Sequence, residues 1–385
     1  MTSSLDRFAA EKLASLDAKH LRRSLAETAR EDGIHVTRGG KRLVSFSCND
    51  YLNLAHHPKV KAAAIAAIER YGVGSGASRL VTGNHPLYAA LESKLARIKG
   101  AEAACVFGSG YLANAGIIPT LAGEDDLILI DEYAHACIWA GAQLARGNLQ
   151  VFRHNDMAHA TALLRQHRAK HPHALIATDG VFSMDGDLAP LPALAALADE
   201  HDAWLLTDDA HGLGVLGGGS GSGAAFAGTA KAAPLQMGTL SKAVGSYGGY
   251  LCAARDVIDL IKTRARSLIY STALPPASVA ASIAALDIIA NDPELCARPL
   301  AKARRFTEAA GLPPAQSPIV PVILGDNRRT LDAASLLESE GFLAIAIRPP
   351  SVPEGSARLR LAFTAGHDDA DIARLAKLIR TRFLA

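Results

Sequence analysis

Short apolar segments alternate with helical patterns through the first two thirds of the chain. A helix repeats its apolar residues every three or four positions, whereas a strand buried on both faces is a short, continuous apolar run. The helical patterns cover residues 59–70, 86–99, 155–170 and 191–201. The apolar runs cover residues 104–107, 127–130, 174–177, 204–207 and 250–253. This alternation predicts an α/β fold with a mostly parallel central sheet flanked by helices.

The two ends of the chain follow different patterns. Leu5, Phe8, Leu13 and Leu16 recur at helical spacing, which predicts an N-terminal helix that packs on other parts of the protein. Beyond residue 276 there are Ala-rich helices, then apolar runs at 319–324, 342–347 and 358–363, then a last helix from residue 368. We therefore expect an N-terminal helical arm (1–48), a large domain (49–280) and a small α+β domain (281–385).

Composition narrows the functional class. The 385 residues are 49% hydrophobic and 20% charged, and the formal net charge is +2 without a long block of one sign. We therefore expect no nucleic-acid and no membrane partner. The five cysteines are scattered without a metal-like spacing, which predicts no metal site and favours a reducing, cytoplasmic location.

Lys242 and Asp208 form the most informative pair of polar residues. Asp208 ends the apolar run 203–207, so its carboxylate is expected at the carboxyl edge of the sheet, where open α/β sheets bind ligands. Lys242 lies among small residues, so its amine can approach a carbonyl closely and form a Schiff base. A carboxylate beside a pyridine nitrogen favours the protonated ring, which then accepts electrons. The pair predicts a site for pyridoxal 5'-phosphate (PLP).

The glycine-rich segment 108–113 follows a predicted strand and opens a helix, so its backbone N–H groups can bind a phosphate. Read as G-x-G-x-x-A, with Asp131 about 20 residues later, it also satisfies the dinucleotide fingerprint. A nucleotide-dependent dehydrogenase is therefore an alternative, although such an enzyme has no use for Lys242. His135, just beyond the next strand, offers a flat imidazole suited to stacking on an aromatic cofactor.

Further polar residues stand at the ends of predicted strands. His211 can reach a ring hydroxyl, and Ser183 and Thr239 offer small donors, although each of these residues can also satisfy only a local turn. Arg348 follows an apolar strand and precedes a run rich in proline. A guanidinium held there is suited to bidentate binding of a carboxylate, such as that of an amino acid.

Together these segments resemble the α-oxoamine synthases, a family of fold-type I PLP enzymes that condense a small amino acid with an acyl-CoA thioester and release CO₂. The resemblance covers nearly the whole chain. It rests above all on segments 239–249 (TLSKAVGSYGG), 269–276 (IYSTALPP) and 346–353 (AIRPPSVP). All three segments, and the last above all, favour the family member that joins L-alanine to a pimeloyl thioester, carried by CoA or by a carrier protein. A sister synthase that uses glycine or serine with another acyl-CoA is the nearest alternative.

The resemblance implies roles for individual residues. It makes Lys242 the Schiff-base lysine, Asp208 the partner of the pyridine nitrogen, His211 the partner of the ring hydroxyl, and His135 the residue on the ring face. The other cofactor-binding residues that it implies are Gly110, Tyr111, Ser183 and Thr239, with Ser271 and Thr272 reaching the phosphate of a neighbouring subunit. It implies substrate-binding roles for Arg22, Asn49, Arg348 and Ser351, and the adjacent Arg23 leaves the register of Arg22 open. A homodimer with shared active sites follows.

Three positions depart from the commonest family pattern. Asn53 replaces a frequent glycine, Ser351 a frequent threonine, and Asp179 a frequent glutamate. The serine and aspartate keep a polar group at their positions. We therefore expect the reaction class to be unchanged, while the acyl preference is less firmly indicated.

Overall fold

The computed structural model describes residues 3–226 and 233–384, which fall into two compact units. Unit 1 contains residues 1–48, 184–186 and 302–385, and unit 2 contains residues 49–183 and 187–301. The first 48 residues thus group with the C-terminal part of the chain. Residues 281–301, expected in the small domain, group with unit 2, because α11 (Pro276–Asn291) packs on α2 (Pro58–Tyr71) and α3 (Leu87–Lys99).

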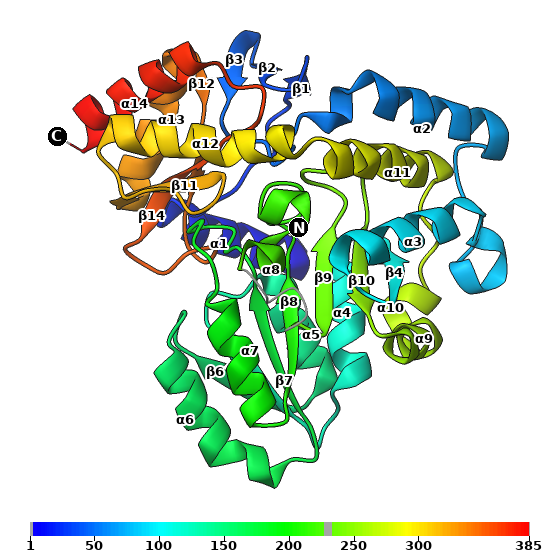
Figure 1. The fold of residues 1–385 in the computed structure, drawn as a ribbon. Helices are drawn as coiled ribbons and strands as arrows, with labels where there is room; N and C mark the ends of the chain where they lie inside the picture. Colours follow the sequence, from blue (N-terminus) through cyan, green and yellow to red (C-terminus); the bar gives the residue numbers. More distant parts are fainter. Residues whose placement is uncertain (1–2, 227–232, 385) are drawn as a thin grey trace. The chain divides into compact units, whose positions relative to one another are not determined.

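A seven-stranded sheet forms the centre of unit 2 (Figure 1). Its strands, in spatial order, are β4 (Ala103–Phe107), β10 (Gly249–Ala253), β9 (Leu235–Thr239), β8 (Trp204–Asp208), β7 (Ala174–Asp179), β5 (Leu127–Asp131) and β6 (Asn148–Phe152). Only β10 runs antiparallel to its neighbours. The predicted mostly parallel sheet is therefore confirmed.

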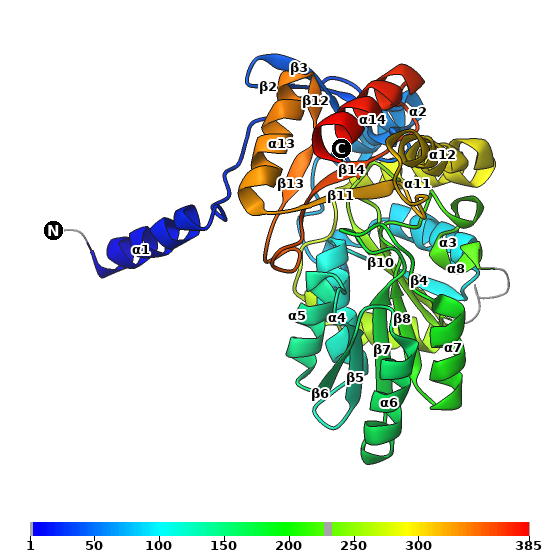
Figure 2. The ribbon, with the colours of Figure 1, turned by 90° about the vertical axis from the view of Figure 1, so that its left-hand side faces the viewer.

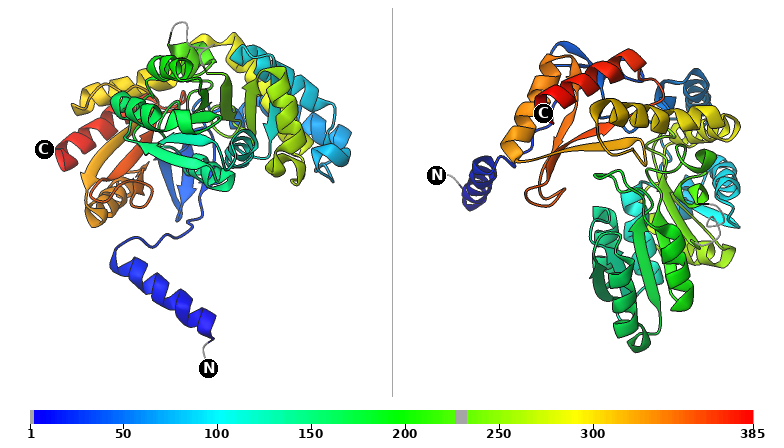
Figure 3. Two further views of the ribbon diagram at one scale, coloured as in Figure 1. Left: turned by 90° about the horizontal axis from the view of Figure 1, so that it is seen from below. Right: turned by 60° about the vertical axis from the view of Figure 1, so that its left-hand side comes forward.

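Alternating residues of each strand pack on opposite faces of this sheet, because successive side chains of a strand point to opposite sides. Ile128 and Ile130 of β5 belong to the apolar cluster that includes residues of α4 and α5. Leu127 and Leu129 belong to the cluster that includes residues of α6 and α7. Both faces of the sheet are thus covered by helices, as Figure 3 also shows.

The remaining helices of unit 2 connect and cover these strands. They are α4 (Gly110–Leu121), α5 (Ala136–Ala145), α6 (Met157–His167), α7 (Leu191–Glu200), α8 (Ser222–Ala225), α9 (Arg255–Arg264) and α10 (Arg266–Ile269), and α12 (Pro293–Ala310) continues into unit 1. Short helical turns lie at Leu54–His56, Arg79–Gly83, Arg168–Lys170 and Gly217–Gly219. No helix in residues 3–226 and 233–384 is long and apolar enough to cross a membrane.

Unit 1 contains two small sheets. One has the order β1 (Ala29–Arg30), β2 (His35–Arg38), β3 (Lys41–Ser45) and β12 (Phe342–Leu343). The other has the order β11 (Ile319–Gly325), β14 (Ala357–Ala362) and β13 (Ile345–Ile347). The helices are α13 (Asn327–Ser339), α14 (Asp369–Phe383) and α1 (Ser4–Ala18). The parallel pairing of β3 with β12 explains why the N-terminal residues group with the C-terminal ones.

Further features differ from the expectation. The segment 1–48, expected to be a helical arm, also contains the strands β1, β2 and β3. The helix α1 forms as predicted (Figure 2). It carries a capping box between Ser3 and Asp6, but it buries none of its side chains, and Leu5 is 72% exposed. The strands β6 and β9 were not expected. Asn148 and Gln150 interrupt the apolar run of β6, and Gln236 and Gly238 interrupt that of β9, so neither strand has a continuous apolar pattern.

Candidate active site

Polar side chains gather at the carboxyl ends of the parallel strands of unit 2. The strands β5, β7 and β8 end on Asp131, Asp179 and Asp208, and β9 ends on Thr239. The register places Asp179 directly opposite Asp208 on the neighbouring strand. All three carboxyl groups are buried. A buried carboxylate is unfavourable unless it is paired, protonated or hydrogen-bonded, so each of the three needs a partner.

Asp208 is fixed by two hydrogen bonds. The Nδ2 atom of Asn114, on α4, donates to Asp208 Oδ2 over 2.8 Å, and the Ala210 backbone N–H donates to Oδ1 over 3.0 Å. The Cys137 thiol lies 3.7 Å from the same Oδ2 atom. Burial and the negative charge of Asp208 raise the pKa of Cys137, so this cysteine stays a thiol. Asp208 therefore presents a carboxylate in a fixed orientation.

His135 and Asp179 lie close enough to Asp208 to interact with it electrostatically, and the charge of Lys242 acts on both of them. Burial lowers the pKa of His135, and the charges of Asp208 and Lys242 act on it in opposite directions. Burial and the neighbouring Asp208 raise the pKa of Asp179, which also accepts a 2.7 Å hydrogen bond from the His135 backbone N–H. The structure thus brings together the predicted ring-face histidine, the predicted anchor lysine and the predicted ring-nitrogen partner.

The start of α4 lies next to Thr239 at the end of β9. The Ser109 side chain caps the helix by accepting from Leu112 N–H, and the first backbone bond runs from Ala113 N–H to the Ser109 carbonyl. The N–H groups of Gly110 and Tyr111 therefore have no partner within the helix. A Cβ atom at Gly110 would lie 3.3 Å from Met237 Cε and 3.5 Å from Thr239 Cβ, so the start of α4 lies directly beside the end of β9.

Two further predicted residues meet around a tyrosine. The hydroxyl of Tyr51 lies 2.7 Å from His211 Nδ1 and donates a longer, 3.4 Å bond to Asn49 Oδ1. Tyr51 and His211 are both buried. The orientation of His211 is thus set by Tyr51 rather than by the backbone alone.

Lys242 lies in a tight turn between β9 and β10. The turn is closed by a bond from Gly245 N–H to the Lys242 carbonyl, over 2.8 Å. Gly245 has φ +68°, and a Cβ atom there would lie 2.4 Å from the backbone nitrogen of Ala55. Only glycine fits this conformation and this close approach without strain.

The predicted substrate arginines lie in unit 1. Arg22, Arg23, Arg348 and Ser351 line one cavity of about 620 Å³. Arg22 pairs with Asp17 over 2.8 Å, whereas Arg23 donates to Ser351 Oγ over 3.0 Å. Both arginines therefore reach this cavity, and Arg23 is the one that contacts Ser351.

Arg348 has unused donor capacity. Its Nη1 atom donates to the His20 carbonyl, and its Nε atom is buried without a hydrogen-bond partner among the described residues. Burial and the nearby Arg23 lower the pKa of Arg348, as expected for a guanidinium that lacks an anionic partner.

The roles predicted for Ser183, Ser271 and Thr272 stay predictions. Ser183 lies in the loop that follows β7, and Thr272 forms an isolated bridge with Ser78. The role assigned to Ser271 and Thr272 requires a second subunit. It therefore stays a prediction.

The dinucleotide alternative does not fit the geometry. Asp131, which would bind a ribose, is buried and accepts from the backbone N–H groups of Tyr133 and Asn155. Its oxygens are thus occupied by the protein itself. In addition, β4 pairs only with the antiparallel β10, unlike the all-parallel start of a dinucleotide-binding fold.

Sequence reasoning missed Asn114 and Tyr51. Asn114 is a polar residue inside the apolar helix α4 and is fully buried, which is a recognisable signal. Tyr51 follows Asn49 closely in sequence, but nothing local indicates its contact with His211, 160 residues away. Only the fold brings them together.

Comparison with known proteins is consistent with this geometry. The family model described as Aminotransferase class I and II matches residues 41–379. A protein named 8-amino-7-oxononanoate synthase from Methylocella silvestris is 68% identical over 347 residues, which cover 90% of this chain and 99% of the relative. The protein of the same name from Beijerinckia indica is 63% identical over 377 residues, covering 98% of this chain and 97% of the relative.

Solved structures show the same fold. A serine palmitoyltransferase from S. paucimobilis with a PLP adduct has a TM-score of 0.90 at 29% identity, and the match covers 99% of this chain and 97% of that one. An 8-amino-7-oxononanoate synthase from Francisella tularensis has a TM-score of 0.76 at 26% identity, covering 89% and 98%.

The fold and the residues at the sheet edge define a PLP-dependent enzyme of fold type I. The N–H groups of Gly110 and Tyr111 at the start of α4 and the fixed Asp208 carboxylate suit the two polar ends of PLP, its phosphate and its ring nitrogen. The chain belongs to the class I and II aminotransferase family and, within it, to the 8-amino-7-oxononanoate synthases.

We expect Asn114→Ala to weaken PLP binding about tenfold, because a hydrogen bond to a charged group contributes about 1.5–3 kcal/mol. Titration of the apoprotein with PLP, followed by absorbance, measures this change. Asn148→Ala, which alters an exposed asparagine on β6, is the matched control and should bind PLP normally. Equal PLP affinity in both variants would show that Asn114 does not support Asp208.

Proposed function

We propose that this protein condenses L-alanine with pimeloyl-CoA or pimeloyl carrier protein, giving 8-amino-7-oxononanoate, the free thiol and CO₂. The observation that carries the proposal is the buried Asp208 carboxylate, fixed by Asn114 and set among His135, Asp179 and Lys242. The names of the relatives at 63–68% identity support the choice of reaction.

PLP, when bound, withdraws electrons from the α-carbon of an amino acid, so this carbon can lose a proton, bond to an acyl carbon and accept the electrons released with CO₂. The protein has to seat the ring, hold the amino acid at a fixed angle and move one proton. The residues of unit 2 serve the first and third of these tasks.

Lys242 provides the reactive amine. Its Nζ atom would hold the cofactor aldehyde and, once free, would be the base that takes the proton from the α-carbon of alanine. The turn closed by Gly245 sets where this amine can reach.

Asp208 keeps the pyridine nitrogen protonated, because a carboxylate beside a basic nitrogen favours its charged form. His211, oriented by Tyr51, would serve the ring hydroxyl, and the imidazole of His135 would cover a ring face. The Gly110 and Tyr111 N–H groups and the Thr239 hydroxyl bind the phosphate, with Ser183 as a further donor to the cofactor.

Arg348 binds the carboxylate of alanine in this proposal. Its buried Nε atom and its guanidinium fork suit bidentate binding. The negative charge of the bound carboxylate would offset the cost of burying the guanidinium. Asn49 assists on the amino-acid side. Arg22 or Arg23 contacts the distal end of the acyl chain, and Ser351 lines the same cavity.

A cytoplasmic homodimer with shared active sites completes the proposal. Tyr270, beside Ser271 and Thr272, is 75% exposed, and α1 carries exposed Leu5 and Phe8. A second subunit would cover such apolar side chains. Free cysteines at all five positions suit a reducing compartment.

A sister reaction is the second candidate. The structural similarity to serine palmitoyltransferase, with a TM-score of 0.90, favours a synthase that uses serine or glycine with another acyl thioester. The sequence identity of that match is only 29%, well below the identity to the 8-amino-7-oxononanoate synthases.

Substrate choice distinguishes the two candidates. We expect the purified protein with PLP to release CoA from pimeloyl-CoA with L-alanine at least about tenfold faster than with glycine or L-serine, because the site is matched to one side chain. Mass spectrometry of the product and a thiol assay measure this. Faster turnover of serine or glycine with another acyl-CoA would favour the sister reaction.

We expect Arg348→Ala to raise the apparent KM for alanine by about 10- to 100-fold, since a charge-assisted hydrogen bond is lost, while PLP stays bound. Arg328→Ala, on the exposed surface of α13, is the control and should leave this KM unchanged. An unaltered alanine KM in Arg348→Ala would remove Arg348 from the substrate site.

A further inference from the structure

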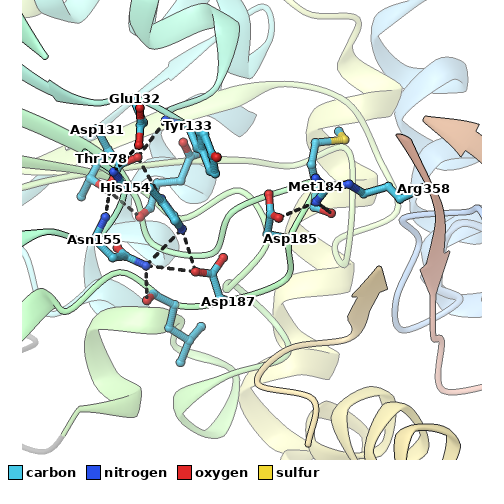
Figure 4. Close-up of polar contacts among 12 residues, drawn as sticks. Asp131, Glu132, Tyr133, His154, Asn155, Thr178, Met184, Asp185, Asp187 and Arg358 are labelled. Carbon is cyan, nitrogen blue, oxygen red and sulfur yellow. Dashed lines mark hydrogen bonds and ion pairs between the residues drawn. The ribbon is translucent and has the colours of Figure 1, made fainter. Parts of the chain in front are cut away.

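His154, just after β6, lies between two carboxylates of unit 2. Its Nδ1 atom is 3.0 Å from Asp131 Oδ1, and its Nε2 atom is 2.8 Å from Asp187 Oδ2 (Figure 4). Carboxylate oxygens can only accept hydrogen bonds, whereas a neutral imidazole has one N–H and one acceptor nitrogen. Both contacts are favourable only if both ring nitrogens carry a proton, and Asn155 Nδ2, 3.3 Å from His154 Nε2, then donates to Asp187 Oδ2 over 3.0 Å instead. The geometry therefore indicates that His154 is a cation.

The surroundings of His154 favour this charge. Burial alone would lower its pKa, but the hydrogen bonds and charges of Asp131 and Asp187 raise it to about 10. The His154 backbone N–H donates to Glu132 Oε1 over 2.8 Å, which adds a third acidic side chain to its surroundings. The Tyr133 ring stacks on the imidazole with centroids 4.5 Å apart. A histidine held in this way remains charged across the physiological pH range.

One partner of His154 anchors the turn that leads to His135. The Oδ1 atom of Asp131 accepts from Tyr133 N–H over 2.8 Å, and the Asp131 carbonyl accepts from Ala134 N–H over 3.0 Å. His135, the proposed ring-face residue, follows directly. The position of Asp131 thus sets the path of the chain into His135.

The other partner closes the loop that carries Ser183. The Asp187 carbonyl accepts from Phe182 N–H over 3.0 Å, and an isolated bridge joins Val181 to Leu188. The edge of the His154 imidazole and the Phe182 ring also meet, with centroids 4.4 Å apart and planes at 88°. His154 therefore contacts the residue just before Ser183 as well as the residue that closes the loop.

We propose that His154 is a positioning residue that joins the His135 turn to the Ser183 loop and so sets how PLP is seated between them. This inference rests on the proposed function, because it takes His135 and Ser183 as cofactor-binding residues. His154 itself touches neither the cofactor nor the substrate in this account. It acts through Asp131 and Asp187.

The first test is PLP binding by the His154→Asn apoprotein, measured by absorbance titration and by visible circular dichroism of the bound cofactor. We expect the dissociation constant to rise about fivefold or more, the lower range of coupling between linked sites. We also expect an altered dichroic band, because the ring sits in a changed asymmetric environment. His171→Asn, which removes a partly exposed histidine that contacts the Asp125 carbonyl, is the matched control.

Asp187→Asn provides a second variant in case His154→Asn folds poorly, since it leaves the contact between His154 and Asp131 in place. In the double variant, the effects of His154→Asn and Asp187→Asn on PLP affinity should not add up, because both changes remove the contact between His154 and Asp187. Normal PLP affinity and an unchanged dichroic band in both folded variants would overturn the inference. Additive effects would also overturn it.

The pH dependence of stability separates a charged His154 from a neutral one. The folded-state pKa lies above the value of about 6.5 for an unfolded histidine. The stabilising contribution is therefore complete below pH 6.5 and is lost as the pH rises toward 10. The urea midpoints of the wild-type and His154→Asn apoproteins should converge over this range. A constant difference between them would contradict a charged His154 between Asp131 and Asp187.

Failure of the proposed function would look different. If the wild-type protein and the His171→Asn control bound no PLP at all, both the function and this inference would fall together. If both bound PLP normally and the His154 variants did so too, only this inference would fail.

Discussion

Three buried carboxyl groups at the ends of neighbouring parallel strands are the constraint on which the site depends. Asp131, Asp179 and Asp208 end β5, β7 and β8, and parallel strands bring their carboxyl ends to one edge. Each carboxylate taken out of water costs several kcal/mol unless it is compensated. Three adjacent negative charges would be incompatible with a stable fold, so each group is compensated in its own way.

The three aspartates are stabilised in different ways and so have different roles. Asp131 is held by backbone N–H groups and by His154, which makes it an anchor for the chain. Burial and the charge of Asp208 raise the pKa of Asp179, and its carboxylate accepts a hydrogen bond from the His135 backbone N–H. Asp208 is oriented by a neutral donor, Asn114, and the pyridine nitrogen of PLP is its natural cationic partner. The site thus matches a cofactor that brings one positive charge to one carboxylate.

Residues with a local sequence signal could be predicted. Asp208 ends a continuous apolar run, Lys242 lies among small residues, and Gly110 opens a helix. The strand end, the turn and the candidate phosphate-binding segment could therefore be predicted from the sequence alone. The supporting residues carry no such signal. Asn114 is 94 residues from Asp208, and the two partners of His154 lie 23 residues before it and 33 after it. Their contacts arise only when the strands are ordered in the sheet, as the unexpected β6 and β9 illustrate.

The central claim is that PLP is held covalently by Lys242 beside Asp208. Reduction of the PLP-loaded protein with borohydride, followed by digestion and peptide mass spectrometry, tests it directly. The account predicts a pyridoxyl phosphate label on the peptide that contains Lys242. A label elsewhere, for example on the buried Lys99 that pairs with Asp209 over 2.7 Å, or no label at all, would contradict it.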